Sequence, residues 1–132
     1  MKNRRKLTYI GAPACFALEQ ACQCLTDAFG IYGVYQVGSS LTGPEWRDVD
    51  IRYILPDDEF AKIFPEAGEY WEHDTRWLLL TVIVSNWLHN ETGLPIDFQF
   101  QPQTHANKHH KGPRNAMGLR MKKHDSQAQT RP

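Results

Sequence analysis

Two short runs of this sequence mix β-branched and aromatic residues with aspartates, and they restrict the chain to folds that contain a β-sheet. Residues 48–55 open with an Asp-Val-Asp triplet and continue in mainly apolar residues, which predicts a strand. In residues 94–101 apolar and polar side chains alternate, which predicts a strand with one buried face. The other face of that strand carries Asp97 and Gln99, and we expect it to look into a cleft or solvent.

The first third of the chain predicts one helix followed by one strand. Pro13 suits a first helical turn and Gly30 suits a stop. The apolar residues between them recur at the spacing of one helix face: Leu18, Cys22, Leu25 and Phe29. We therefore expect a helix over residues 13–29. Residues 31–37 are β-branched and aromatic and end at a Gly-Ser-Ser turn, which predicts a strand that runs into a tight turn.

The middle of the chain predicts two further helices. Residues 40–47 contain a Thr-Gly-Pro sequence, which interrupts any regular element. Asp57 is a candidate cap for a short helix over residues 59–64, and a longer helix is expected over residues 72–91. The β-branched residues 81–84 also fit a strand, so both interpretations of that segment stay open.

The length of 132 residues allows one domain with one core, and a second sizeable domain would not fit. We divide the chain into a body of residues 1–103, with a short basic N-terminal end, and a basic His- and Lys-rich segment of residues 104–132. We expect the basic segment to be partly disordered, above all in its last ten residues. A short helix can form there over residues 115–122.

Several classes of protein are disfavoured by composition. The longest nearly apolar run, residues 77–88, is shorter than the roughly 20 residues that a membrane span needs. No secretory signal is evident, so we expect a cytoplasmic protein without a membrane partner. The odd number of cysteines argues against a disulfide framework, and their spacing argues against a zinc site. We expect them to serve helix packing or to face solvent: Cys15, Cys22 and Cys24.

Charge is distributed unevenly along the chain. Residues 7–103 hold four Lys or Arg side chains against fourteen Asp or Glu, a balance of −10. The remaining residues, at the two ends, hold eleven Lys or Arg against one Asp, a balance of +10. Basic ends of this kind either are simply solvated or contact polyanions such as triphosphates and nucleic acid.

The aspartates of the two predicted strands suggest a metal site. Residues two apart in a strand project to the same face, so Asp48 and Asp50 lie side by side, and Asp97 can join them from another strand. Three carboxylates repel one another unless a cation lies between them, and oxygen ligands favour Mg²⁺ or Mn²⁺. Such a cation keeps positions open for a triphosphate. These acids therefore predict phosphoryl or nucleotidyl transfer.

The turn that ends the strand of residues 31–37 supplies a candidate phosphate cradle. Gly38 lets the backbone approach an anion closely. The amides and hydroxyls of Ser39 and Ser40 can donate hydrogen bonds to phosphate oxygens.

These motifs together resemble the minimal nucleotidyltransferases of the DNA polymerase β-like superfamily. The similarity rests on Val37-Gly38-Ser39, eight intervening positions, Asp48-Val49-Asp50-Ile51, and Ile96-Asp97-Phe98, and it spans about residues 13–101. It implies an α/β (α+β) fold with a small mixed sheet flanked by helices. It also implies that Asp48 and Asp50 bind the metals, that Asp97 binds the catalytic metal and helps to activate the acceptor hydroxyl, and that Gly38 and Ser39 hold the nucleotide phosphates.

The chain also departs from that family. The spacer before the first aspartate is about one residue shorter than usual, and it lacks the Arg-Gly pair that many minimal members carry. The helical domain that holds the nucleobase in larger relatives is missing. A homodimer, another protein or the basic segment must then take that part.

The basic segment follows directly on the strand of Asp97, and we expect it to lie near the metal site. Lys111 and Arg114 are candidate phosphate contacts, whereas a simply solvated segment remains the alternative. A His-rich metal site is a further alternative by spacing: His105, His109 and His110. Trp46 can stack on a base, and the other tryptophans are expected in the core: Trp71, Trp77 and Trp87.

The expected activity is the transfer of a nucleoside monophosphate from a magnesium-bound nucleoside triphosphate to a hydroxyl acceptor, with release of pyrophosphate. The acceptor, whether RNA, protein or a small molecule, is unknown from the sequence. The alternative is a catalytically inactive nucleotide- or RNA-binding or regulatory module of the same fold.

Overall fold

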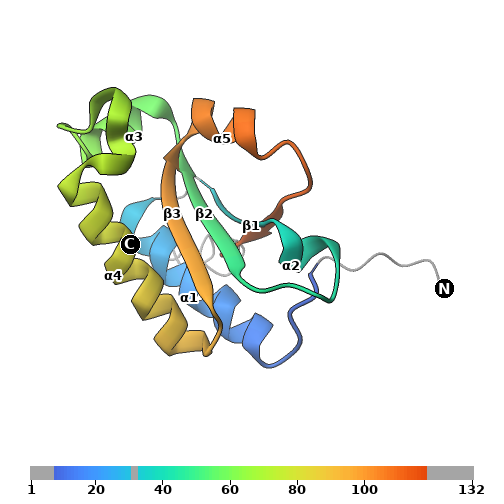
Figure 1. Cartoon of the computed structure of the whole chain (residues 1–132). Helices are drawn as coiled ribbons and strands as arrows, with labels where there is room; N and C mark the ends of the chain where they lie inside the picture. The colour runs from blue at the N-terminus through green and yellow to red at the C-terminus, as the bar shows by residue number, and fades with distance from the viewer. Residues whose placement is uncertain (1–7, 31–32, 119–132) are drawn as a thin grey trace, which may run out of the picture.

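The computed structural model describes residues 8–30 and 33–118, and its centre is a four-stranded mixed sheet with the order β3-β2-β1-β4 (Figure 1). β1 pairs antiparallel with both β2 and β4, whereas β2 and β3 run parallel. The expected small mixed sheet with helices is confirmed. The strands are β1 (Val34–Val37), β2 (Val49–Leu55), β3 (Ile96–Pro102) and β4 (Asn115–Met117).

Two long helices cover one face of the sheet. In Figure 1, α1 (Ala14–Phe29) lies behind the strands, and α4 (Thr75–Thr92) runs along the edge strand β3. The helix predicted over residues 13–29 is confirmed, and its apolar face is buried because the i, i+4 spacing puts Leu18 and Cys22 against the sheet. Cys24 on the same helix is exposed.

The start of α4 differs from the expected helix over residues 72–91. Residues 72–73 end the short helix η1 (Gly68–His73), and Asp74 caps α4 by accepting a hydrogen bond from the Trp77 amide at 3.0 Å. Gly93, with φ 75°, ends the helix in the left-handed conformation. The alternative strand over residues 81–84 is wrong, since these residues lie in the middle of α4.

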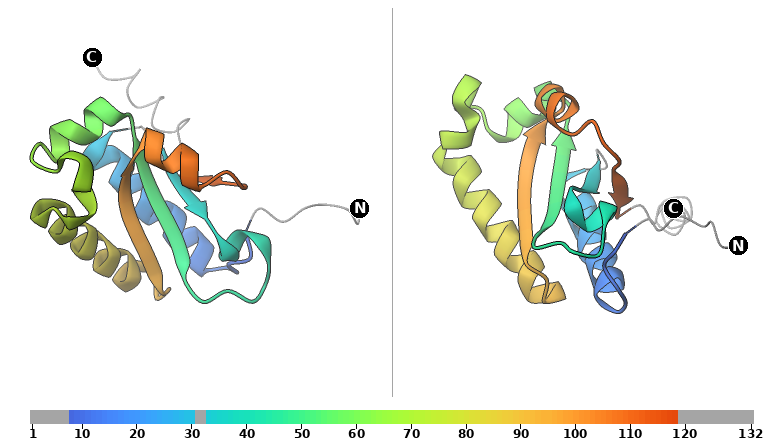
Figure 2. Two further views of the ribbon diagram at one scale, coloured as in Figure 1. Left: turned by 45° about the horizontal axis from the view of Figure 1, so that its top comes forward. Right: turned by 45° about the vertical axis from the view of Figure 1, so that its right-hand side comes forward.

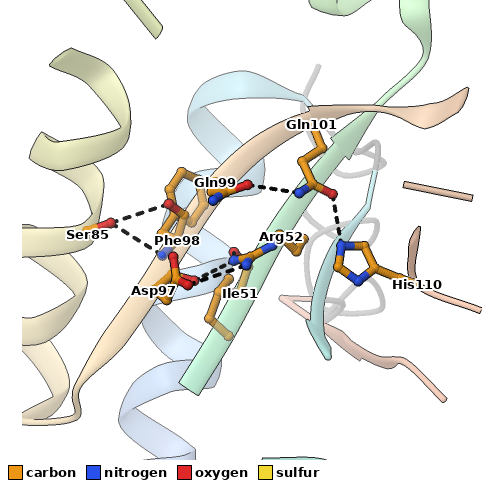
Figure 3. A network of polar contacts seen from close by, with 8 residues as sticks. All are labelled: Ile51, Arg52, Ser85, Asp97, Phe98, Gln99, Gln101 and His110. Atoms are coloured by element: carbon orange, nitrogen blue, oxygen red, sulfur yellow. Dashed lines mark hydrogen bonds and ion pairs between the residues drawn. The ribbon is translucent and has the colours of Figure 1, made fainter. Parts of the chain in front are cut away.

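α4 also shields the outer edge of β3 (Figure 3). The Ser85 hydroxyl bonds both the amide and the carbonyl of Phe98, at 3.3 and 3.4 Å, and Trp77 Nε1 donates to the Phe100 carbonyl at 2.9 Å. An open strand edge is a template for unwanted pairing. The side chains of Ser85 and Trp77 occupy backbone groups of β3 that would otherwise be open to pairing with another strand.

The core lies between the sheet and the two long helices, and aromatic rings from the strands fill much of it. Tyr53 and Phe100 stack with centroids 5.6 Å apart, and Phe98 meets Phe100 edge-on at 4.9 Å. Trp71 and Trp77 are buried, as expected from the sequence. The other two tryptophans are partly buried against the same core: Trp46 and Trp87.

Short helices occupy the ends of the strands. Residues 40–47 were expected to hold no regular element, but one helical turn, α2 (Ser39–Thr42), follows β1 directly. α3 (Asp57–Ile63) begins after Pro56, so Asp57 is its first residue and not its cap. The Asp57 carboxylate instead accepts hydrogen bonds from the amide and hydroxyl of Thr104, at 3.0 and 2.6 Å, in α5 (Gln103–His109). Asp57, predicted to cap the helix that follows it, thus bonds the first turn of α5 instead.

The basic segment is part of the fold as far as residue 118. α5 stands at the C-terminal end of β3, and the chain then crosses to the far edge of the sheet (Figure 2). The expected helix over residues 115–122 is wrong at its start, because Asn115–Met117 form β4 beside β1. Three regions of the sequence-based expectations lie outside the described residues: the N-terminal residues 1–6, residues 31–32 and the segment from residue 119 onward.

None of the helices in residues 8–30 and 33–118 combines the length and the hydropathy that crossing a membrane requires.

Candidate metal and phosphate site

The register of the parallel pair β2–β3 brings two of the predicted acids together. Asp50 is the direct partner of Asp97, and it also faces Val37 at the end of β1. Asp48 lies just before β2, and its charge acts on Asp50. The structure thus pairs Asp50 with Asp97 at the start of two neighbouring strands, and Asp48 is close enough for its charge to act on Asp50.

Electrostatic crowding marks Asp50 among these acids. Burial raises the pKa of its carboxyl above the ordinary value, and the charges of Asp97 and Asp48 raise it further, while Arg52 acts in the opposite direction. Both effects disfavour a charge on Asp50. Asp48 is exposed, whereas the Asp97 side chain is 46% exposed. The group is therefore open to solvent on the side of Asp48.

Arg52 is the member of this site that the sequence reasoning missed. It is only 7% exposed and lies two residues after Asp50, on the same face of β2. Its Nη1 donates to the Asp97 carbonyl oxygen at 2.6 Å, and its Nη2 lies 3.5 Å from Asp97 Oδ2 (Figure 3). The signal was present in the sequence, because an arginine at the i+2 position of an Asp-x-Asp strand must face the same acids.

The three carboxylates do not converge on a single point. Among the described residues, no three His, Cys, Asp or Glu side chains are placed to hold a metal ion together. Asp97 is turned toward Arg52. In the described residues, the histidines of the His-rich alternative are not placed to hold a metal ion together either: His105, His109 and His110. Within residues 8–30 and 33–118, Asp48 and Asp50 form no ion pair, although the charge of Arg52 acts on Asp50.

The glycine turn lies directly beside the acids. Gly38 has φ 82° and ψ −158°, and a Cβ built on it would overlap Oδ2 of Asp50. The reason is the pairing of Val37 with Asp50, which places the next residue over the carboxylate. Only glycine leaves this space open without backbone strain.

The two serines of the turn point in different directions. Ser39 is exposed, so its amide and hydroxyl can reach a phosphate. Ser40 is fully buried, and its hydroxyl oxygen accepts a hydrogen bond from Gln36 Nε2 at 2.8 Å. The Ser40 hydroxyl, predicted to contact phosphate, is therefore bonded inside the fold instead. Ser39 is the serine of the turn that faces the site.

A pocket of about 410 Å³ joins this turn to the basic segment. Gly38, Ser39 and Thr42 line one wall, and His109, His110 and Gly112 line the opposite wall. The basic segment thus lies beside the glycine turn, whereas Lys111, Arg114 and the three acids are not among the residues that line this pocket. A second pocket of about 290 Å³ opens between Asp48 and Asp97 on the sheet and Val82 and Ser85 on α4.

The two basic residues singled out from the sequence have different surroundings. The Arg114 guanidinium donates to the carbonyl oxygens of His110 and Ala106 at 3.1 and 3.3 Å, and it lies 5.5 Å from the ring centroid of Tyr35. Arg114 therefore ties α5 and its following loop to β1. Lys111 is exposed at the rim of the same loop.

The histidines of the segment join the polar network of the sheet. His110 Nε2 lies 3.1 Å from Oε1 of Gln101, and Gln101 Nε2 donates to Gln99 at 2.9 Å (Figure 3). His105 and His109 stack with centroids 4.1 Å apart. Burial, and then neighbouring positive charges, lower the pKa of His110 below its ordinary value. Its imidazole is thus favoured in the neutral form.

Comparisons of the chain with protein-family models, with curated proteins and with solved structures find no match.

Proposed function

We propose that this protein is a metal-dependent nucleotidyltransferase, which moves a nucleoside monophosphate from a nucleoside triphosphate to a hydroxyl acceptor. The observation that carries the proposal is the register pair of Asp50 and Asp97, with Asp48 close enough for its charge to act on Asp50 and Gly38 directly against Asp50. Acids gathered beside an open glycine turn suit a cation and the phosphate chain that the cation accompanies.

The donor atoms suit Mg²⁺ or Mn²⁺. All the candidate ligands are carboxylate oxygens, which hard divalent cations prefer. The raised pKa of Asp50 reflects burial and repulsion by Asp48 and Asp97, and a cation would relieve that repulsion. When bound, Mg²⁺ would neutralise charge on the triphosphate and orient it for displacement.

The side chains of the site suggest how the reaction would be divided among them. The acceptor oxygen attacks the α-phosphorus, the bond from that phosphorus to its bridging oxygen breaks, and pyrophosphate leaves. Asp97 is the candidate to take the acceptor's proton, because it is half-exposed on the pocket that α4 borders. Gly38 and Ser39 would seat the departing phosphates. The rate advantage would come mainly from positioning and charge.

A transfer assay tests this function. The purified chain is incubated with α-labelled nucleoside triphosphates, Mg²⁺ and a cell extract, and labelled products are identified by mass spectrometry. We expect one class of acceptor, whether RNA, protein or small molecule, to gain label while pyrophosphate is released. The double variant Asp48→Ala/Asp50→Ala should lose the transfer, and Glu91→Gln, an exposed acid at the end of α4, should keep it. Equal labelling by the double variant would overturn the proposal.

One observation favours a second candidate, a nucleotide- or RNA-binding module of the same fold without turnover. Asp97 is engaged by Arg52, so the third acid is partly neutralised before any substrate arrives. Binding of a fluorescent nucleotide with and without Mg²⁺ separates the two functions. Affinity that needs Mg²⁺ together with Asp48 and Asp50 supports the transferase, whereas affinity that ignores both supports the module.

A further inference from the structure

Arg52 is a buried cation placed inside the proposed metal site. Its side chain is 9% exposed, and in the described part of the chain its Nε has no hydrogen-bond partner. Taking a guanidinium out of water without full pairing is costly. Because β2 is buried on both faces from Ile51 to Leu55, a neutral side chain would fit this position at lower cost, and the charge calls for a role in the site.

The contacts of Arg52 point to Asp97. Nη1 donates to the Asp97 carbonyl at 2.6 Å and to the Ile51 carbonyl at 3.1 Å, and these bonds hold the guanidinium plane across β2 and β3. Nη2 lies 3.5 Å from Asp97 Oδ2, within ion-pair distance. Arg52 therefore stands where a cation bound to Asp97 would stand, and its position is set by two backbone carbonyls.

The net charge of the site indicates how many divalent cations it can hold. Three carboxylates and one guanidinium leave two negative charges, which a single divalent cation neutralises. Without Arg52 the same carboxylates would carry three negative charges, one more than a single divalent cation neutralises, and this excess would favour a second cation. Two-metal sites of phosphoryl transfer hold their ions about 4 Å apart, and both ions share acidic ligands.

We propose that Arg52 is a built-in cation of this site, so that the chain binds one Mg²⁺ or Mn²⁺ at Asp48 and Asp50 rather than two, with Asp97 held by Arg52. The inference rests on the proposed function, since it concerns the cation of that site. It assigns Asp97 to the protein's own guanidinium, and it leaves the outer oxygen of Asp97 free to face an acceptor.

The test counts the ions. The full chain, without nucleotide, is titrated with Mn²⁺, and the electron paramagnetic resonance signal of the free ion reports how many ions are bound. We expect one ion per chain for the wild type and two for Arg52→Gln. In that variant the second ion should bind at least about tenfold more tightly than any second ion of the wild type, because one positive charge has been removed.

A matched control separates this effect from a general change of charge. Arg47 is exposed and immediately precedes Asp48, so Arg47→Gln removes one positive charge near the acids without touching Asp97. We expect Arg47→Gln to keep one bound ion, and Arg52→Lys, which retains the charge, to keep one as well. A second ion in Arg47→Gln would overturn the specific role of Arg52.

A second variant keeps the proposal testable if Arg52→Gln does not fold, as a thermal melt followed by circular dichroism would show. Asp97→Asn should still bind one Mn²⁺, with an affinity lowered by about tenfold at most, because the substitution removes a neighbouring negative charge but no ligand. A wild type that binds two ions, or an Asp97→Asn that loses its ion, overturns the inference.

The two proposals fail in different ways. A wild type that binds no Mn²⁺ overturns both. A wild type that binds one ion, becomes a two-ion site in Arg52→Gln and transfers no nucleotide supports the role of Arg52 while overturning the transferase.

Discussion

The α-carbon of Gly38 lies against the carboxylate of Asp50, so any side chain at position 38 would displace Oδ2 of Asp50. This contact joins the phosphate-binding turn to the metal-binding acids. It depends on the antiparallel pairing of Val37 with Asp50, which ends β1 directly beside the site.

Replacing Gly38 with alanine should damage the site and the fold together. An alanine at φ 82° is strained by about 1–3 kcal/mol, and its methyl group pushes the Asp50 carboxylate aside. We expect a lower melting temperature and weaker Mn²⁺ binding. Gly43→Ala is the matched control, because Gly43 has extended backbone at φ −168° and open space around it. Equal effects of the two substitutions would contradict the assignment.

Replacing Asp50 with asparagine should stabilise the metal-free protein at neutral pH. Because the folded-state pKa of Asp50 is raised, the wild type loses stability as the pH rises through that pKa, and asparagine avoids the loss. Water screens this partly exposed group, so we expect a gain of no more than about 1 kcal/mol in the free energy of unfolding.

Urea unfolding from acid to neutral pH measures this gain. The advantage of Asp50→Asn should be absent near the ordinary carboxyl pKa of 3.8, grow above it and then level off. Mg²⁺ should stabilise the wild type and leave the variant unchanged. A variant that is less stable than the metal-free wild type at neutral pH would contradict the crowding of these acids.

Asp57 and Thr104 should form a coupled pair that loses its stabilising effect in acid. The two hydrogen bonds from Thr104 lower the pKa of Asp57, so their contribution is present above pH 3.8 and is lost as the pH falls through the folded-state pKa. Asp57 is largely exposed, so the pair is worth about 1 kcal/mol or less. A double-mutant cycle with Asp57→Asn and Thr104→Val measures the coupling, and Asp58→Asn, in the same helical turn, should show none with Thr104→Val.

We expect Arg114 to support the fold and Lys111 to contribute to nucleotide binding. Arg114→Gln removes hydrogen bonds to the carbonyls that end α5, and we expect it to cost about 1–2 kcal/mol of stability. Lys111→Gln should leave the melting temperature unchanged and weaken nucleotide binding in low salt. Nucleotide affinity and thermal melts of both variants check this. Loss of affinity without loss of stability in Arg114→Gln would instead make Arg114 the phosphate contact.

Local patterns in the sequence predicted most of the elements. The helical spacing from Leu18 to Phe29 and the alternation in residues 96–100 are visible without any knowledge of partners, because each depends on the geometry of one element. The β-branched residues 81–84 of α4 fit two kinds of structure, a helix and a strand. Packing against the sheet and the cap at Asp74 decide for the helix.

Pairing between distant segments could not be predicted in the same way. β4 has three residues, and its backbone hydrogen bonds to β1 make it a strand. The composition of residues 104–118 fitted both a solvated tail and a segment that contacts phosphate. Ala106 on the inner side of α5 and Met117 in β4 bury that segment against the rest of the fold.

The sequence by itself determined which residues can carry the chemistry, because Asp48 and Asp50 share a strand face wherever that strand lies, and Gly38 permits a turn that other residues resist. Only the tertiary structure decided how these groups meet. The parallel register sets Asp97 beside Asp50, the antiparallel register sets Gly38 over the same carboxylate, and Arg52 is held at Asp97 by backbone carbonyls. Register is a relation between strands, and no single strand contains it.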